Sequence, residues 1–167
     1  LSLGRTCHVL RLSSPAAAEE ARRLAQLHHP NVVDVFEVFD SPKGSYMAVE
    51  HIKGRSLRQV LSARGAMSVD EARRMLKPVC EALEFARGQG VVLGGLDLSS
   101  IVLSDDGFVK VVDLASARPE DAGRTDVQAL AACLGELLTA EAPRAGAAPA
   151  VGLAVEALLR ESAAGVV

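Results

Sequence analysis

Apolar and polar residues alternate over short stretches in the first part of the chain. Residues 32–39 (VVDVFEVF) and 46–52 (YMAVEHI) show the two-residue period of half-buried strands, and the turn-forming residues at 40–45 connect them as a hairpin. CHVLRL at 7–12 predicts a further short strand. The stretch at 13–27 places Ser before Pro and acids before arginines, which favours a helix. The first part is therefore predicted to run strand, helix, strand, strand.

Helical periods dominate the next part, beginning with a short piece at 56–63. Ser68 and Glu71 have the spacing of a capping box, which predicts that a helix starts there and continues to about Gly88. Pro78 lies inside this helix and is expected to bend it, because proline lacks a backbone donor. The apolar stripe of the helix consists of Ala72, Met75, Leu76, Val79, Leu83 and Ala86.

Short strands follow at 91–92, 101–103 and 108–112, and the turn SDDG joins the last two. The stretch at 125–139 (TDVQALAACLGELLT) is apolar almost all round, which predicts a central, buried helix. The remaining segments are predicted as a Pro/Ala/Gly-rich linker at 141–150 and a helix at 150–162.

Composition narrows the class of protein. A length of 167 residues suits one domain or two small lobes that share a core, and 49% hydrophobic with 23% charged residues is typical of a globular chain. Aromatic residues make up only 3%, so the core must consist of Ala, Leu and Val. The net charge of −3 argues against nucleic acid as a partner, since phosphate binding needs a basic face.

No apolar stretch reaches the roughly 20 residues that span a bilayer. There is no signal-peptide pattern at Leu1 and no initiator Met, so we expect a cytoplasmic domain that belongs to a longer chain. Cys7, Cys80 and Cys133 are odd in number and far apart, which fits neither a disulfide framework nor a zinc site. We expect all three to be buried, reduced thiols.

Four segments, taken together and in this order, resemble the protein kinase fold, in particular that of bacterial Ser/Thr kinases. They are EARRLAQLHHPNVV (20–33), YMAVEHIKGRSL (46–57), VVLGGLDLSSIVLSDDGFVKVVDLASA (91–117) and TDVQALAACLGELLT (125–139). They are similar to the regulatory helix with its His-Pro-Asn segment, the hinge, the catalytic loop with its hairpin and metal-binding turn, and the central helix of the large lobe.

The resemblance implies a truncated, two-lobed fold of the α+β class. Residues 1–52 would form the small lobe, a β-sheet with one helix, in which the glycine-rich loop is absent or lies upstream. Residues 53–167 would form a reduced, mostly helical large lobe. Only twelve residues separate Asp113 from Asp126, so the activation segment would be very short and would offer no platform for a peptide substrate.

The same resemblance indicates that catalytic groups are missing. Gly95 takes the place of the catalytic Asp, and Ser100 that of the metal-binding Asn. Glycine has no side chain to accept a proton. Asp97 lies two residues further on, which is a large displacement within a constrained loop, and we expect it to be a solvated loop residue.

The phosphate-binding groups are also altered. No strand lysine is present: CHVLRL offers Arg11, or Leu10 if the register slips by one. Glu20 matches the glutamate of the regulatory helix but equally fits a surface helix acid. Asp113 survives in Asp-Leu-Ala, where it binds metal or only caps a turn. No glycine-rich loop is found, and Gly4 is expected to turn a hairpin.

We therefore expect a pseudokinase: not an enzyme, without metal or cofactor, acting as a scaffold or regulatory module that binds another protein or a second copy of itself. ATP is not expected as a ligand. An apolar patch left uncovered on the helix at 125–139 would mark the interface.

Two alternatives stay open. One is a nucleotide sensor that binds ATP without transferring phosphate, with Glu20, Asp113 and the hinge residues Glu50 and Ile52 as weak candidates for the binding site and Val49 at the back of the pocket. The other is a transferase of kinase fold with altered chemistry.

Overall fold

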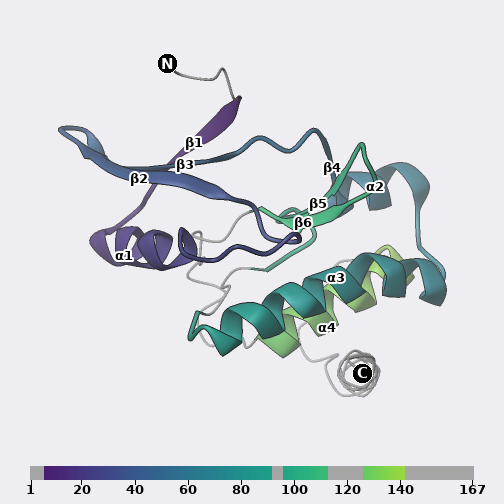
Figure 1. Cartoon of the computed structure of the whole chain (residues 1–167). Helices are drawn as coiled ribbons and strands as arrows, with labels where there is room; N and C mark the ends of the chain where they lie inside the picture. The colour runs from purple at the N-terminus through teal and green to yellow at the C-terminus, as the bar shows by residue number, and fades with distance from the viewer. Residues whose placement is uncertain (1–5, 92–95, 113–125, 142–167) are drawn as a thin grey trace.

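The computed structural model describes residues 6–91, 96–112 and 126–141, and the α+β class is confirmed (Figure 1). The first sheet and its helix comprise β1 (Cys7–Arg11), α1 (Pro15–Leu24), β2 (Val35–Ser41) and β3 (Gly44–Glu50). The second group comprises β4 (Gly54–Ser56), α2 (Leu57–Arg64), α3 (Val69–Gly88), β5 (Ile101–Ser104), β6 (Val109–Val111) and α4 (Asp126–Thr139).

The first sheet is antiparallel and has the strand order β1-β3-β2, so β3 is its central strand. Helix α1 lies against one face of this sheet (Figure 1). Its start follows the predicted pattern: the Ser14 side chain accepts a hydrogen bond from the Ala17 N–H, and Pro15 occupies the first turn. The buried residues of α1 are Ala18, Ala21 and Leu24.

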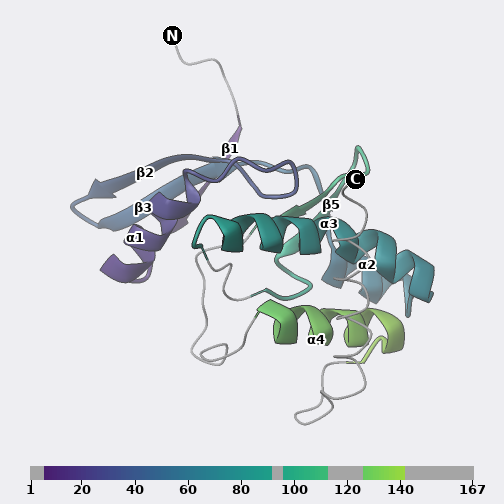
Figure 2. The same cartoon turned by 60° about the horizontal axis from the view of Figure 1, so that its bottom comes forward.

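The second sheet is also antiparallel, in the order β4-β5-β6. Helices α3 and α4 lie side by side, and both views place them on the side of the molecule away from the first sheet (Figures 1 and 2). The strand predicted at 91–92 reaches into residues outside the described part, as do the linker at 141–150 and the helix at 150–162. The division into lobes at residue 52 stays a prediction.

Capping boxes start two of the helices. At α2 the pair is Ser56 and Gln59, and at α3 it is the predicted pair, Ser68 and Glu71. Hydrogen bonds from Ser68, that of its backbone N–H above all, lower the pKa of the Glu71 carboxyl. Helix α3 continues through Pro78 without interruption.

The core is aliphatic, as composition predicts. Its largest fully buried side chains are Leu24, Met47, Leu57, Leu76, Leu98, Ile101, Leu130 and Leu137, together with Val32, Val33 and Val79. Cys80 and Cys133 are buried, but Cys7 is exposed, so the expectation of three buried thiols is wrong for Cys7. Cys7 begins an edge strand whose first residues contribute nothing to the core.

The chain between α1 and β2 connects the two sheets. The Val33 N–H donates to the Val111 carbonyl over 2.9 Å, and the Val111 N–H donates to the Asn31 carbonyl over 2.8 Å. The Asn31 side-chain amide also donates to the Val109 carbonyl over 2.8 Å. These bonds hold β6 of the second sheet beside the segment that enters the first.

Gly54 permits a close approach between β4 and β5. A Cβ atom added there would lie 2.3 Å from the Leu103 carbonyl oxygen and 2.7 Å from the Ser104 Cα. Both atoms belong to the backbone of the paired strand, so neither can move without disturbing the sheet. We predict that Gly54→Ala lowers the free energy of unfolding by about 1–3 kcal/mol, measured by urea unfolding.

Gly88→Ala is the matched control, because a Cβ at Gly88 meets no atom within 4 Å at the end of α3. It should leave stability unchanged or raise it by up to about 1 kcal/mol. Equal effects of the two substitutions would contradict this role for Gly54.

Candidate functional site

A cavity of about 470 Å³ lies between the first sheet and the second group of elements. One wall comes from β1, the residues after it and β3, and the opposite wall from the loop before β5, from β5 and from the end of β6. The lining residues are His8, Leu10, Arg11, Leu12, Ser13, Met47, Val49, Glu50, Ile52, Ser99, Val102 and Val112.

The register of the first sheet decides which side chain of β1 faces the core. Leu10 pairs with Met47, which is only 2% exposed, so Leu10 lies on the inner face of the sheet. Arg11 pairs with Tyr46 on the outer face, and its guanidinium donates to the Lys43 carbonyl over 3.1 Å. The sequence analysis named two residues, Arg11 and Leu10, that could stand in the place of the family's strand lysine. The one that faces inward is Leu10, which carries no charge.

Glu20 lies on α1 and has its ion pair with Arg23 on the same helix, at 3.7 Å. Its side chain is 34% exposed. Arg11 is not the partner of Glu20, because the Arg11 guanidinium is bound at the β2–β3 turn. The arrangement fits a surface helix acid.

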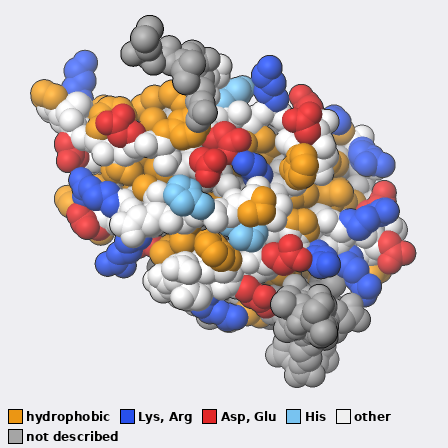
Figure 3. Space-filling model, viewed as in Figure 1, with side chains coloured by type: hydrophobic (Ala, Val, Ile, Leu, Met, Phe, Trp, Pro, Cys, Tyr) orange, Lys and Arg blue, Asp and Glu red, His pale blue; other side chains and the backbone are white. Residues whose placement is uncertain are grey.

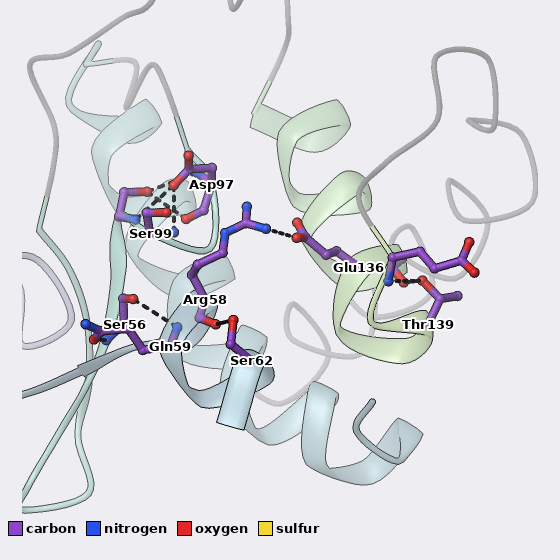
Figure 4. A network of polar contacts seen from close by, with 11 residues as sticks. Ser56, Arg58, Gln59, Ser62, Asp97, Ser99, Glu136 and Thr139 are labelled. Carbon is purple, nitrogen blue, oxygen red and sulfur yellow. Dashed lines mark hydrogen bonds and ion pairs between the residues drawn. The ribbon is translucent and has the colours of Figure 1, made fainter. Parts of the chain in front are cut away.

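The loop before β5 is closed by its own polar groups (Figure 4). The Asp97 Oδ1 atom accepts hydrogen bonds from the Ser99 N–H at 2.7 Å and the Ser100 N–H at 3.0 Å. The Ser100 hydroxyl donates to the Asp97 carbonyl at 2.8 Å and accepts from the Asp97 N–H at 3.0 Å. Ser100 is only 3% exposed. The expectation of a solvated Asp97 is wrong: the side chain is half-buried and caps a turn.

The candidate hinge residues lie along the cavity. Val49 is buried, and Glu50 and Ile52 are half-buried. The Glu50 carboxylate forms an ion pair with Lys110 of β6 at 2.6 Å, so it links the two sheets. Sequence reasoning did not find this pair. Gly95 and Asp113, the other two candidate positions, lie outside the described residues.

A second pair that sequence reasoning missed joins α2 to α4. The Arg58 guanidinium donates to the Glu136 carboxylate, whose side chain is only 6% exposed (Figure 4). The Arg58 backbone N–H donates to the Leu98 carbonyl over 2.9 Å, so one residue contacts both α4 and the loop before β5. The sequence contains one indication of this pair, which is the acidic residue Glu136 within an otherwise apolar part of the helix.

Two further groups have pKa values shifted by burial. Burial raises the pKa of the Cys80 thiol to about 11, so the thiol stays protonated at neutral pH and is unsuited to nucleophilic chemistry. Burial raises the pKa of Asp126 at the start of α4, and the nearby Arg87 opposes that shift. Within residues 6–91, 96–112 and 126–141, no group of three or more potential ligand side chains could hold a metal ion. No helix in those residues is long and apolar enough to span a bilayer.

Comparison with known proteins defines the class. The family described as "Protein kinase domain" matches residues 9–135, and the chain therefore belongs to the protein kinase family. The solved structure of Rad53 residues 1–466 in complex with AMP-PNP superimposes with a TM-score of 0.70. That match covers 93% of this chain and 48% of the other at 19% identity, so it shows the fold alone.

Among curated relatives, the chain is similar to two probable serine/threonine-protein kinases named PknB. The one from Corynebacterium glutamicum is 28% identical over 78% of this chain and 25% of the relative. The one from Bifidobacterium longum is 30% identical over 61% of this chain and 16% of the relative. Sperm motility kinase 2A of Mus musculus is 34% identical over 56% of this chain and 19% of the relative. The chain thus spans a quarter or less of these proteins.

Removing the charge of Glu136 should destabilise the chain. We predict that Glu136→Gln lowers the free energy of unfolding by about 1–3 kcal/mol. The loss should be smaller than for a fully buried pair, because the Arg58 side chain is 40% exposed and can turn to water. The measurement is urea unfolding of Glu136→Gln, Arg58→Met and the double variant, whose coupling energy isolates the pair.

Glu19→Gln is the control, since Glu19 pairs with Arg22 on the surface and the two side chains are 69% and 42% exposed. It should cost about 0.5 kcal/mol or less. A cost equal to that of Glu136→Gln would contradict a special role for the α2–α4 pair.

His29 gives the fold a pH dependence. Its Nδ1 atom accepts from the Asn31 N–H at 3.2 Å, and its ring lies 5.1 Å from that of Phe85. Burial lowers the pKa of His29 below its ordinary value of 6.5, and Glu81 partly opposes the shift. The unfolded chain therefore binds this proton more readily, so the stability that the neutral ring contributes is present above about pH 6.5 and is lost as the pH falls.

We predict that the melting temperature of the native sequence falls more steeply from pH 7 to pH 5 than that of His29→Asn. His28→Asn is the control, because the His28 side chain is 80% exposed; it should keep the native slope. Parallel slopes for the native chain and His29→Asn would rule out this contribution.

Proposed function

We propose that the chain is a catalytically inactive member of the protein kinase family, a pseudokinase, and that it acts as a protein-binding or regulatory module. Family membership implies the fold but not the activity. The proposal concerns which phosphotransfer groups remain.

The observation that carries the proposal is that the side chains of Asp97 and Ser100 are hydrogen-bonded within their own loop. Both residues follow the glycine at position 95 within five positions, and each is already hydrogen-bonded within the loop itself. An aspartate that accepts two backbone N–H groups is a turn cap and is poorly placed to accept a substrate proton. The Ser100 hydroxyl, occupied as donor and acceptor, is likewise a poor Mg²⁺ ligand.

Leu10 supports the same proposal. Phosphoryl transfer depends on a cation that holds the phosphates, and Leu10 occupies the inner face of β1, where such a side chain would reach the cavity. Two charged residues also line the cavity, and each has a partner: the Arg11 guanidinium donates to the Lys43 carbonyl, and the Glu50 carboxylate pairs with Lys110.

A protein-binding role draws support from the surface. The exposed large apolar side chains of the described residues are Val9, Phe36, Val69 and Phe108, and Val9 is 55% exposed on the outer face of the first sheet. Figure 3 shows hydrophobic side chains gathered over this sheet among charges of both signs. The expected patch on α4 is not found, since none of these residues lies on that helix. A chain that stays monomeric and binds nothing in its parent complex would contradict this role.

A second candidate function is nucleotide binding without phosphate transfer. The observation in its favour is the cavity itself, with Glu50 and Ile52 on its rim.

We predict that the full chain transfers no phosphate. The assay uses labelled ATP with Mg²⁺ or Mn²⁺ and a generic protein substrate, beside an active kinase as positive control. Incorporation should equal that of a protein-free blank. Asp97→Asn keeps the acceptor oxygen of the turn but cannot act as a base, so it should fold normally and give the same blank level.

Any phosphate transfer above the blank would contradict the proposal. The Asp97→Asn variant would then show whether Asp97 takes part in that transfer. Transfer that Asp97→Asn abolishes would make Asp97 the base. Transfer that it leaves unchanged would favour a transferase with altered chemistry.

A further inference from the structure

Two histidines that lie far apart in the sequence face each other at the edge of the first sheet. His8 lies on β1, and His51 directly follows β3. The Nε2 atom of His8 and the Nδ1 atom of His51 are 2.5 Å apart, and the ring centroids are 4.5 Å apart. His8 is exposed and His51 is half-buried, so an ion in solvent can reach the two facing nitrogens from the side of His8.

The strand register explains why the two rings meet. His8 is paired with Val49 across β1 and β3, so these two side chains share one face of the sheet. Side chains alternate along an extended chain, and the ring contact shows that His51, two residues after Val49, keeps to that same face. His8 and His51 are therefore diagonal neighbours, at a spacing that long side chains can bridge.

Two facing imidazole nitrogens can share a proton or bind one metal ion. A neutral imidazole has one N–H and one lone pair, so the metal-free pair shares one hydrogen bond. A change of tautomer in one ring turns both N–H groups outward and leaves two lone pairs directed at the same point, with no change in the number of bound protons. Imidazole is a ligand for Zn²⁺, Ni²⁺ and Cu²⁺, whereas Mg²⁺ prefers oxygen ligands.

The geometry of the pair is close to that of a metal site. Two Zn–N bonds of about 2.0–2.1 Å at a tetrahedral angle place the nitrogen atoms about 3.3 Å apart. The His8 and His51 nitrogens would have to separate by somewhat less than about 1 Å to reach that distance. The exposed His8 side chain can make this movement without disturbing the core.

Neighbouring acids and thiols leave the pair with two protein ligands. The Glu50 carboxylate is bound to the Lys110 ammonium at 2.6 Å, and the Cys7 side chain lies on the opposite face of β1 from its neighbour His8. Within residues 6–91, 96–112 and 126–141, no third side chain completes a larger cluster of potential ligands. Structural zinc sites have four protein ligands and catalytic sites three, so a site with two, completed by water, suits a metal that binds reversibly.

We propose that His8 and His51 form a two-histidine binding site for a divalent transition-metal ion of the Zn²⁺, Ni²⁺ and Cu²⁺ class. The ion fastens β1, which is an edge strand with mostly exposed residues, to the segment that follows β3. The inference goes beyond the proposed function and does not rest on it, because it uses neither Ser100 nor Asp113 and concerns no phosphate transfer.

Metal titration of the full chain tests this site. Calorimetry with Zn²⁺ or Ni²⁺ should give one bound ion per chain, and Mg²⁺ should give no binding under the same conditions. A saturating concentration of Zn²⁺ or Ni²⁺ should raise the melting temperature by several degrees, because an ion that binds the folded chain stabilises it.

Substitutions of the two ligands locate the ion. His8→Gln and His51→Gln should each weaken binding at least about tenfold and remove the rise in melting temperature, because one of two ligands is lost. His28→Gln is the matched control, since it removes an 80% exposed histidine outside the pair. Cys7→Ser is a second control, which removes the exposed thiol beside His8. Both controls should keep the native affinity.

Electron paramagnetic resonance of the Cu²⁺ complex needs no substitution and should show coupling to two imidazole nitrogens in the native chain. The proposal is overturned if one such nitrogen or none is seen, or if neither Zn²⁺ nor Ni²⁺ binds. It is also overturned if His8→Gln and His51→Gln bind as tightly as the native chain, or if His28→Gln or Cys7→Ser abolishes binding. None of these outcomes bears on the proposed function, which the phosphate-transfer assay tests separately.

Discussion

A buried carboxylate requires a partner, and Glu136 of α4 has Arg58. Arg58 also donates its backbone N–H to the Leu98 carbonyl in the loop before β5, so the residue that neutralises Glu136 lies where α2, α4 and that loop meet. The loop in turn accepts the Val112 N–H at the Ser100 carbonyl, over 2.8 Å. The ion pair and these backbone hydrogen bonds together form one connected set of contacts among α2, α4, the loop and the end of β6. Losing the charge at Glu136 would loosen elements that lie far apart in sequence.

The same loop shows how, under the proposed function, the fold would persist without phosphate transfer. In the proposed reading, Asp97 and Ser100 serve the backbone of the turn, and their bonds keep the loop in shape whether or not a substrate is present. A side chain can keep a loop in shape without taking part in catalysis. Capping the turn needs only an acceptor near the backbone N–H groups, whereas proton transfer needs an acceptor that is not already hydrogen-bonded. Under that proposal, the hydrogen bonds of Asp97 and Ser100 are accounted for without a catalytic role.

The cavity is preserved by similar means. Glu50 and Lys110 join the two sheets beside it, and the Asn31 side chain and backbone hold β6 against the segment that enters β2. These contacts join the two sheets whose residues form the walls of the cavity.

The sequence by itself determined the elements and the family. Periodicity placed the strands and helices of the described part except β4, whose three residues are too few to show a period. The Ser68–Glu71 capping box marked the start of α3, and four ordered segments indicated the kinase fold, because these signals are local. The tertiary structure decided everything that depends on partners distant in sequence. Strand pairing placed Leu10 inward and Arg11 outward, and packing brought Arg58 to Glu136, 78 residues away. A one-residue change of register reverses every side chain of a strand, so only the paired sheet could fix which residue faces the cavity.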